Sequence, residues 1–196
     1  VLHRGAKALV TLRDGAAVPA LCDWLAANGH AAAEVTVLER LGGPLEQMRP
    51  GPVSDATAPV MAAILARDPG LSRAAGLPDE LFAHDGQITK RPVRALTLSA
   101  LAPRSGEHLW DLGAGSGSIS VEWCLAGGTA SAVERRADRL PNIRANAEAF
   151  GLTHRLTAVE GVTTEVLATL PAPDAVFIGG GVDAALIDAL WQRHAP

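Results

Sequence analysis

Apolar and polar positions follow one another along the second half of the chain in a repeating order of short strands and longer helices. Apolar runs of strand length lie near 108–112, 130–134, 156–160 and 174–178. Each run is followed by a segment whose apolar residues have helical spacing, near 116–126, 137–150, 162–170 and 183–194. A further helix, with Thr89 as its N-cap, is predicted before them over 89–102. This order predicts an α/β domain with a parallel sheet and helices on both of its faces.

The first third of the chain has a different pattern of predicted elements. A strand over 8–12, a helix over 18–28 and a strand over 34–39 are predicted to form one strand–helix–strand unit. The stretch that follows is rich in proline and glycine, and its apolar run at 60–66 fits either a strand or a short helix. The predicted division is a small α/β unit over 1–66, a linker over 67–86 and the regular domain over 87–196.

The composition narrows the class of protein further. Of the 196 residues, 48% are hydrophobic and 19% are charged, which is enough for a buried core. No apolar run approaches the ~18 residues of a membrane span and no secretory signal opens the sequence, so a cytoplasmic location is expected. A formal net charge of −4 argues against a broad nucleic-acid surface. Cys22 and Cys124 are expected to be free thiols, and the six histidines lack the spacing of a metal site.

A carboxylate and three alternating glycines end the first strand of the regular domain. Asp111 is followed by Gly113, Gly115 and Gly117, where a helix is predicted to begin. Such glycines permit a tight turn and let a ligand approach the backbone, while the helix offers free amides. A dinucleotide fingerprint would need its third glycine at 118, which is Ser118. The spacing instead resembles motif I of the class I methyltransferases, which hold S-adenosylmethionine, and predicts that Asp111 faces the amino group of its methionine moiety.

Two further strand ends carry candidate cofactor contacts. Glu134 ends the second strand, 23 residues beyond Asp111, where a carboxylate can accept both hydroxyls of a ribose. The alternative for Glu134 is a solvated strand end beside neighbouring arginines. Gly161 and Val162 follow the third strand, at the corner that borders the adenine in methyltransferases, and the alternative there is an ordinary turn.

Two features are candidates for the substrate side. The fourth strand is followed by three glycines, among them Gly179 and Gly180, which leave open space for a substrate beside the methyl donor. The alternative is that these glycines form a flexible hinge. Lys90 and Arg94 lie one helical turn apart and form a basic patch for the carboxylates of an anionic substrate, unless they are only solvated charges. Because alignment of donor and acceptor can supply much of the acceleration of a methyl transfer, no catalytic base is predicted.

Several segments resemble one family. The segments 76–82, 84–90, 93–96, 111–119 and 177–181 are similar to the carbon-15 methyltransferase and decarboxylase domain of cobalamin biosynthesis. Residues 37–44 resemble the rear of the tetrapyrrole methylase domain, which would make 1–66 the tail of such a domain. This order of the two halves is that of the fused precorrin-6B C5,15-methyltransferases (decarboxylating).

The resemblance implies a class I methyltransferase fold with a Rossmann-like sheet and S-adenosylmethionine as the cofactor. It implies methylation of carbon 15 of a precorrin and removal of carbon dioxide from the acetate of ring C. It also implies assembly into homo-oligomers, with a tetramer as the expected state. The implied cofactor contacts are Thr89, Gly113, Ala114, Gly115, Ser116, Gly117, Glu134, Gly161 and Val162. A basic rim of Lys90, Arg91 and Arg94 would face the substrate, which bears many carboxylates.

The sequence also bears on how complete the two domains are and on two alternative functions. The sheet is expected to have fewer strands than a complete methyltransferase domain, and the front of the first domain is expected to be missing, so methylation of carbon 5 is not expected of this chain. A nicotinamide-dependent oxidoreductase shares the strand–glycine–helix pattern but needs the other glycine spacing. A non-catalytic module that binds S-adenosylmethionine is the second alternative, and turnover would separate it from an enzyme.

Overall fold

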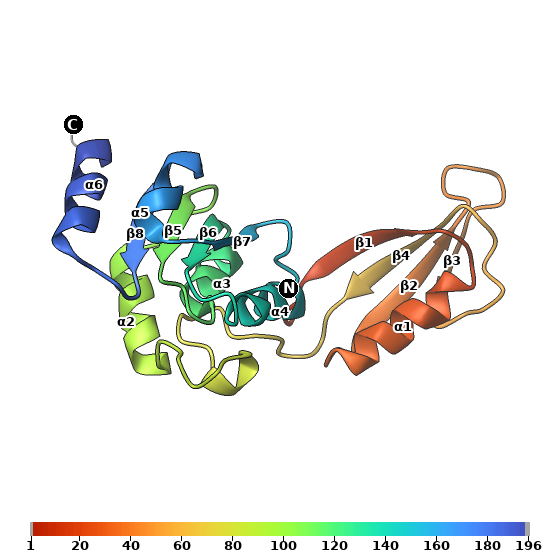
Figure 1. Ribbon diagram of the computed structural model, residues 1–196. Helices are drawn as coiled ribbons and strands as arrows, with labels where there is room; N and C mark the ends of the chain where they lie inside the picture. The colour runs from red at the N-terminus through yellow and green to blue at the C-terminus, as the bar shows by residue number, and fades with distance from the viewer. Residues whose placement is uncertain (1, 195–196) are drawn as a thin grey trace. The chain divides into compact units, whose positions relative to one another are not determined.

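The structure is a computed structural model that describes residues 2–194 (Figure 1). Internal contacts divide the chain into two compact units, residues 1–72 and residues 73–196. The segment 73–86, which the sequence pattern assigned to a linker, therefore belongs to the second unit. Among the described residues, no helix is long and apolar enough to cross a membrane.

The first unit is an antiparallel sheet with one helix. Its elements are β1 (Lys7–Leu12), α1 (Ala17–Ala27), β2 (Glu34–Glu39), β3 (Gln47–Pro50) and β4 (Val60–Leu65). The strand order is β1-β4-β2-β3, so β4 lies between β1 and β2 and is antiparallel to both. The predicted strand–helix–strand unit is confirmed, and the ambiguous apolar run at 60–66 is the central strand β4.

The core of the first unit lies between α1 and one face of this sheet. Val18 of α1 packs with Val37 of β2 and Val60 of β4, and all three side chains are buried. Burial along β4 alternates with a period of two, because successive side chains of a strand point to opposite faces.

The second unit is built on a parallel sheet. Its strands are β5 (His108–Leu112), β6 (Thr129–Glu134), β7 (Leu156–Glu160) and β8 (Ala175–Ile178), in the order β7-β6-β5-β8. All three pairings are parallel, which confirms the predicted α/β architecture. The chain runs outward from β5 through β6 to β7 and then crosses to the other side of β5 for β8. The strand order thus reverses beside β5, the place where sheets of this kind bind their ligands.

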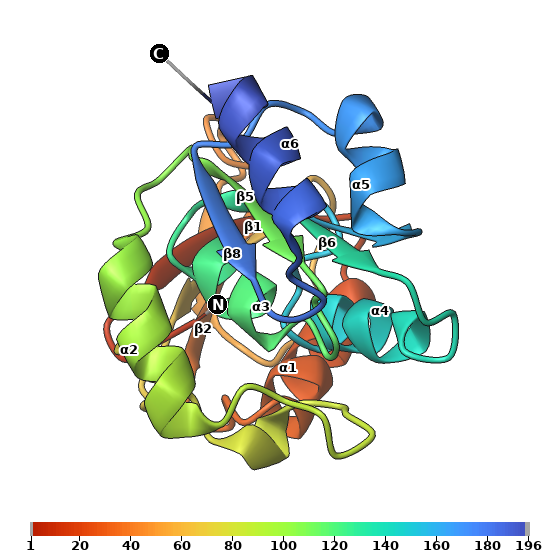
Figure 2. The same ribbon diagram turned by 60° about the vertical axis from the view of Figure 1, so that its left-hand side comes forward.

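Helices cover both faces of the parallel sheet (Figures 1 and 2). On one face, Trp110 and Leu112 of β5 pack with Leu167 and Leu186 from the last elements of the chain. On the other face, α3 packs against β5 and β6, and α4 against β7. The helical elements are η1 (Asp79–Leu81), α2 (Arg91–Leu101), α3 (Ser118–Leu125), α4 (Leu140–Ala149), α5 (Thr163–Val166), η2 (Leu167–Thr169) and α6 (Ala184–His194).

The first turn of α2 differs from the prediction. The helix begins at Arg91, with Pro92 in its first turn, and Lys90 occupies the N-cap position without a side-chain cap. Thr89 is therefore not the N-cap that the sequence pattern predicted. Proline suits this place because the amides of a first helical turn have no partner within the helix.

Candidate functional site

The glycine-rich turn joins β5 to α3 at the carboxyl edge of the parallel sheet. Gly113, Gly115 and Gly117 have φ angles of +77°, +58° and +72°, in the left-handed region that favours glycine. The amides of Gly113 and Ala114 both donate to the Val133 carbonyl of β6 at 2.9 Å, and the Gly117 amide donates to the Ala114 carbonyl at 2.8 Å. Helix α3 begins at the next residue. The turn therefore directs the amino end of α3 toward the edge at which a ligand would bind.

The turn after β8 lies against the turn after β5. A Cβ atom on Gly113 would lie 2.8 Å from the Gly180 carbonyl oxygen, and one on Gly179 would lie 2.7 Å from the Gly113 carbonyl oxygen. Both distances are too short for a side chain, so the two backbones meet directly where the strand order reverses. Gly179 consequently has a packing role at this point. At Gly180, the described residues other than its two chain neighbours leave the place of a Cβ open, with no heavy atom within 4 Å.

Asp111 is a buried carboxylate just before the glycine turn. Its Oδ2 accepts hydrogen bonds from the Ser120 amide (3.3 Å) and hydroxyl (2.7 Å). Its Oδ1 is buried and has no hydrogen-bond partner among the described residues. Burial raises the pKa of Asp111 to about 6, against the hydrogen bonds from Ser120, and the charge of Glu134 adds to the rise. A cationic donor fits this position, because it would bond to Oδ1 and favour the charged form of the carboxylate.

Glu134 holds the middle of the glycine turn at the end of β6. Its side chain is buried, and its Oε2 accepts a hydrogen bond from the Gly115 amide at 2.9 Å. Its Oε1 accepts from the Arg136 amide at 2.9 Å. Glu134 is therefore not the solvated strand end that was its alternative. An ionised carboxylate has about four acceptor sites, so Glu134 retains capacity for the hydroxyls of a bound ligand.

The corner after β7 lies beside the same strand end. The Gly161 amide donates to the Glu134 backbone carbonyl at 3.1 Å, and Gly161 has a φ of +153°. Val162 follows with 47% of its surface exposed. An exposed apolar side chain near the buried Glu134 can pack on the face of a flat, aromatic ligand group.

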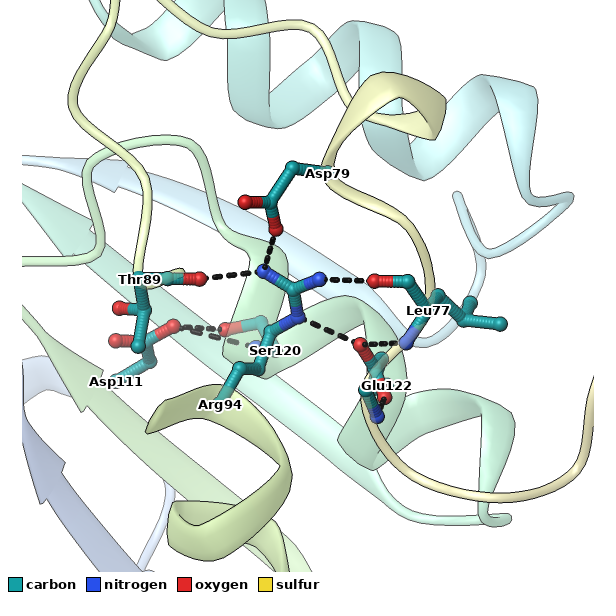
Figure 3. A network of polar contacts seen from close by, with 8 residues as sticks. Leu77, Asp79, Thr89, Arg94, Asp111, Ser120 and Glu122 are labelled. Carbon is teal, nitrogen blue, oxygen red and sulfur yellow. Dashed lines mark hydrogen bonds and ion pairs between the residues drawn. The ribbon is translucent and has the colours of Figure 1, made fainter. Parts of the chain in front are cut away.

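Arg94 does not line the rim of the site. Its side chain is fully buried and donates hydrogen bonds to Glu122 (2.6 Å), to Asp79 (3.0 Å) and to the carbonyls of Leu77 and Thr89 (Figure 3). The prediction that Arg94 belongs to a basic surface patch was wrong. The helical spacing predicted correctly which face of α2 carries Arg94, but it could not show that this face packs against α3. There Glu122 of α3 supplies the opposite charge.

The other two cations of the expected rim are at the surface. Lys90 and Arg91 are both exposed at the start of α2. Thr89, directly before them, gives its carbonyl to the buried Arg94. Because Gln87 O lies 3.7 Å from the place of a Cβ on Gly115, this part of the chain lies beside the glycine turn.

Comparison with known proteins decides the family. The sequence profile of the precorrin methyltransferase domain matches residues 80–196 of this chain. The chain belongs to this family. Its parallel sheet, the reversal of strand order beside β5 and the glycine turn at that place are those of a Rossmann-like α/β fold.

Relatives in this family extend the match over nearly the whole chain. A Sinorhizobium protein named precorrin-6Y C(5,15)-methyltransferase [decarboxylating] is 48% identical, and the match covers 96% of this chain and 49% of that protein. A Mycobacterium tuberculosis protein of the same name is 42% identical over 92% of this chain and 48% of its own length. The chain thus spans about half the length of the curated relatives that it matches.

A solved structure resembles about two thirds of the chain. The crystal structure of the C-terminal domain of precorrin-6Y C5,15-methyltransferase from Rhodobacter capsulatus has a TM-score of 0.63 and 60% sequence identity, and the match covers 64% of this chain and 68% of that one. These relatives do not favour the oxidoreductase alternative.

Sequence reasoning missed the polar side chains that α3 carries into the core of this precorrin methyltransferase domain. Ser120 bonds to Asp111, and Glu122 bonds to Arg94 and to the amides of Gly76 (2.6 Å) and Leu77 (3.0 Å). Nearly every residue of α3 is buried. A glutamate within the apolar run of this helix was the available signal, because a buried carboxylate needs an ion partner.

Proposed function

We propose that the second unit binds S-adenosylmethionine at the carboxyl ends of β5, β6 and β7. The single observation that carries this proposal is the buried Oδ1 of Asp111, which has no hydrogen-bond partner in the part of the chain that the structure describes. It lies beside a left-handed glycine turn, in a chain of the precorrin methyltransferase family. The proposed contacts are those that the sequence predicted, namely Thr89, Asp111, Gly113, Ala114, Gly115, Ser116, Gly117, Glu134, Gly161 and Val162.

Each contact has a distinct physical role in this proposal. Asp111 accepts a hydrogen bond from the ammonium group of the ligand, and the amides at the start of α3 face its carboxylate. Glu134 accepts the ribose hydroxyls, and Val162 packs on the adenine. When bound, S-adenosylmethionine supplies an electrophilic methyl group on a sulfonium. The chain contributes mainly alignment, since no described side chain is proposed as a base.

We propose further that the substrate is a precorrin, methylated at carbon 15 and decarboxylated at the acetate of ring C, in cobalamin biosynthesis. The names of the relatives support this substrate class. Exposed Lys90 and Arg91 provide cations for its carboxylates, and the exposed Gly180 leaves room beside the glycine turn, while Gly179 is proposed to face the substrate through its backbone alone. Residues 1–66 are proposed to belong to a tetrapyrrole methylase domain, as segment 37–44 suggests.

The proposed setting is the cytoplasm, with the chain acting as a homo-oligomer on a small molecule and without nucleic acid. The anionic substrate and the net charge of −4 support the absence of a nucleic-acid partner. Light scattering after size-exclusion chromatography tests the oligomer, and a monomer at micromolar concentration would contradict it.

Calorimetric titration of the 196-residue chain with S-adenosylhomocysteine tests the cofactor. Micromolar binding is expected, and NADH is expected to show none; binding of NADH alone would overturn the proposal. A second assay supplies S-adenosylmethionine with a labelled methyl group and a precorrin. Transfer of label with release of carbon dioxide is expected, whereas cofactor binding without turnover would support the non-catalytic module instead.

A further inference from the structure

A buried amide side chain connects the glycine turn to the segment that passes beside it. Asn146 lies in α4 and is 1% exposed. Its Nδ2 donates to the Ser116 carbonyl at 2.8 Å and to the Ala83 carbonyl at 2.9 Å. Its Oδ1 accepts from the Ala83 amide at 2.7 Å. Both Nδ2 hydrogens are thus used, and one side chain joins two segments that are 33 residues apart, 83 and 116.

The bond to Ser116 fixes one peptide plane of the turn. The Ser116 carbonyl and the Gly117 amide belong to the same rigid peptide group. The carbonyl accepts from Asn146, and the amide on the opposite side donates to the Ala114 carbonyl at 2.8 Å. The glycines that flank Ser116 have broad conformational freedom, so the turn needs such a restraint from outside. Asn146 therefore limits the orientation of the amides that open α3.

The bonds to Ala83 fix the segment that leads to Thr89. Both backbone polar groups of Ala83 bond to Asn146, and further along the segment Asp85 forms an ion pair at 2.9 Å with Arg139, the N-cap residue of α4. The segment ends at Thr89, where the buried Arg94 holds the carbonyl. Between these anchors Gln87 passes the glycine turn, with its carbonyl 3.7 Å from the place of a Cβ on Gly115.

We propose that Asn146 is a positioning residue of the cofactor site, which holds the glycine turn and the segment 83–89 in register so that Thr89 and the turn contact one ligand. This inference rests on the proposed binding of S-adenosylmethionine and adds a residue to it. Asn146 touches no ligand atom itself. Its effect on binding passes through Ser116 and Ala83.

Asn146→Asp separates this role from simple packing. The variant keeps the size of the side chain and the acceptor for the Ala83 amide, but it loses both hydrogens that bond to the two carbonyls. Asn142→Asp is the matched control, because it makes the same change on the same helix at a half-buried position. Asn146→Ala removes all three bonds without adding a charge.

The experiment measures the Kd of S-adenosylhomocysteine below the unfolding temperature of each variant, with folding checked by near-ultraviolet circular dichroism. Asn146→Asp is expected to raise the Kd about tenfold, the equivalent of one ordinary hydrogen bond. Asn142→Asp is expected to leave it unchanged within about twofold, a small surface effect. Hydrogen exchange is expected to accelerate at 83–89 and 113–117, while the amides of β5 and β6 keep their protection.

Lowering the pH supplies a signature that lost packing cannot give. A protonated carboxyl at position 146 can again donate one hydrogen bond, so the Kd ratio between Asn146→Asp and the unsubstituted chain is expected to shrink at lower pH. The ratio for Asn146→Ala should not change.

An unchanged Kd in folded Asn146→Asp, or equal losses in Asn142→Asp, would overturn the positioning role alone. Absence of binding to the unsubstituted chain would instead overturn the proposed function, and this inference with it.

Discussion

Replacement of Asp111 by asparagine tests the link between the stability of the domain and its proposed ligand. Asp111 is buried before the glycine turn, and its Oδ1 has no partner among the described residues. Ionisation at this position is opposed by burial, which raises the pKa from the usual 3.8 to about 6. Asparagine keeps the shape and an acceptor for Ser120, but it carries no charge that burial could penalise.

The magnitude follows from linkage between proton binding and folding. Below about pH 3 the carboxyl is protonated in both states and contributes no pH-dependent difference. Between about pH 4 and 6 the unfolded chain ionises first, so stability falls as the pH rises, by about 1.4 kcal/mol per unit. The shift from 3.8 to about 6 therefore corresponds to a loss of about 3 kcal/mol in the native chain at neutral pH. Asp111→Asn should remove this dependence.

Urea unfolding at a series of pH values measures the effect. The difference in unfolding free energy, variant minus native, is expected to move in favour of Asp111→Asn by about 3 kcal/mol between about pH 3 and 7. Any constant offset from the new amide cancels in this change. Asp138→Asn is the control: Arg136 lowers the pKa of exposed Asp138, so the difference should move in the opposite direction.

A difference that does not depend on pH would refute the reasoning, because it would mean that Asp111 has an ordinary pKa in the folded chain. The same variant should bind S-adenosylhomocysteine more weakly, although it avoids the loss of stability that the native chain undergoes between acid and neutral pH. Native affinity in Asp111→Asn would contradict the proposed contact with the ammonium group.

Four further substitutions test the remaining parts of the site. Arg94→Met leaves Glu122 buried without its ion partner and should lower the free energy of unfolding in urea by about 3–5 kcal/mol. Adding Glu122→Gln should recover part of this loss, and additive losses of the two substitutions would contradict an energetic coupling between Arg94 and Glu122. Gly115→Val should abolish binding of S-adenosylhomocysteine in a folded chain, because a β-branched residue is strained at a φ of +58°. Native affinity in this variant would mean that the ligand does not approach the backbone closely at Gly115. Glu134→Ala should weaken that binding by about 1.5–3 kcal/mol in calorimetry, and unchanged affinity would remove the ribose contact. Lys90→Glu should lower precorrin turnover more than cofactor affinity, and equal losses in the two assays would contradict a position on the substrate side.

The amino-acid sequence by itself determined where the elements of the second unit lie. The predicted strands at 108–112 and 156–160 coincide with β5 and β7, and the alternation of strands and helices predicted the parallel sheet. These features are local, because apolar periodicity and glycine spacing act within one element and its turn. The same holds for the left-handed glycines of the turn after β5, whose spacing indicated a cofactor site.

Tertiary structure decided which polar residues are buried and what they bond to. Arg94 looked like a surface cation, but its partner Glu122 is 28 residues away, and the Leu77 amide that also bonds to Glu122 is 45 residues away. The bond between Asn146 and Ala83 spans 63 residues. Periodicity can identify the face of a helix but not what packs against it, and the protonation and partners of a buried group depend on that neighbour.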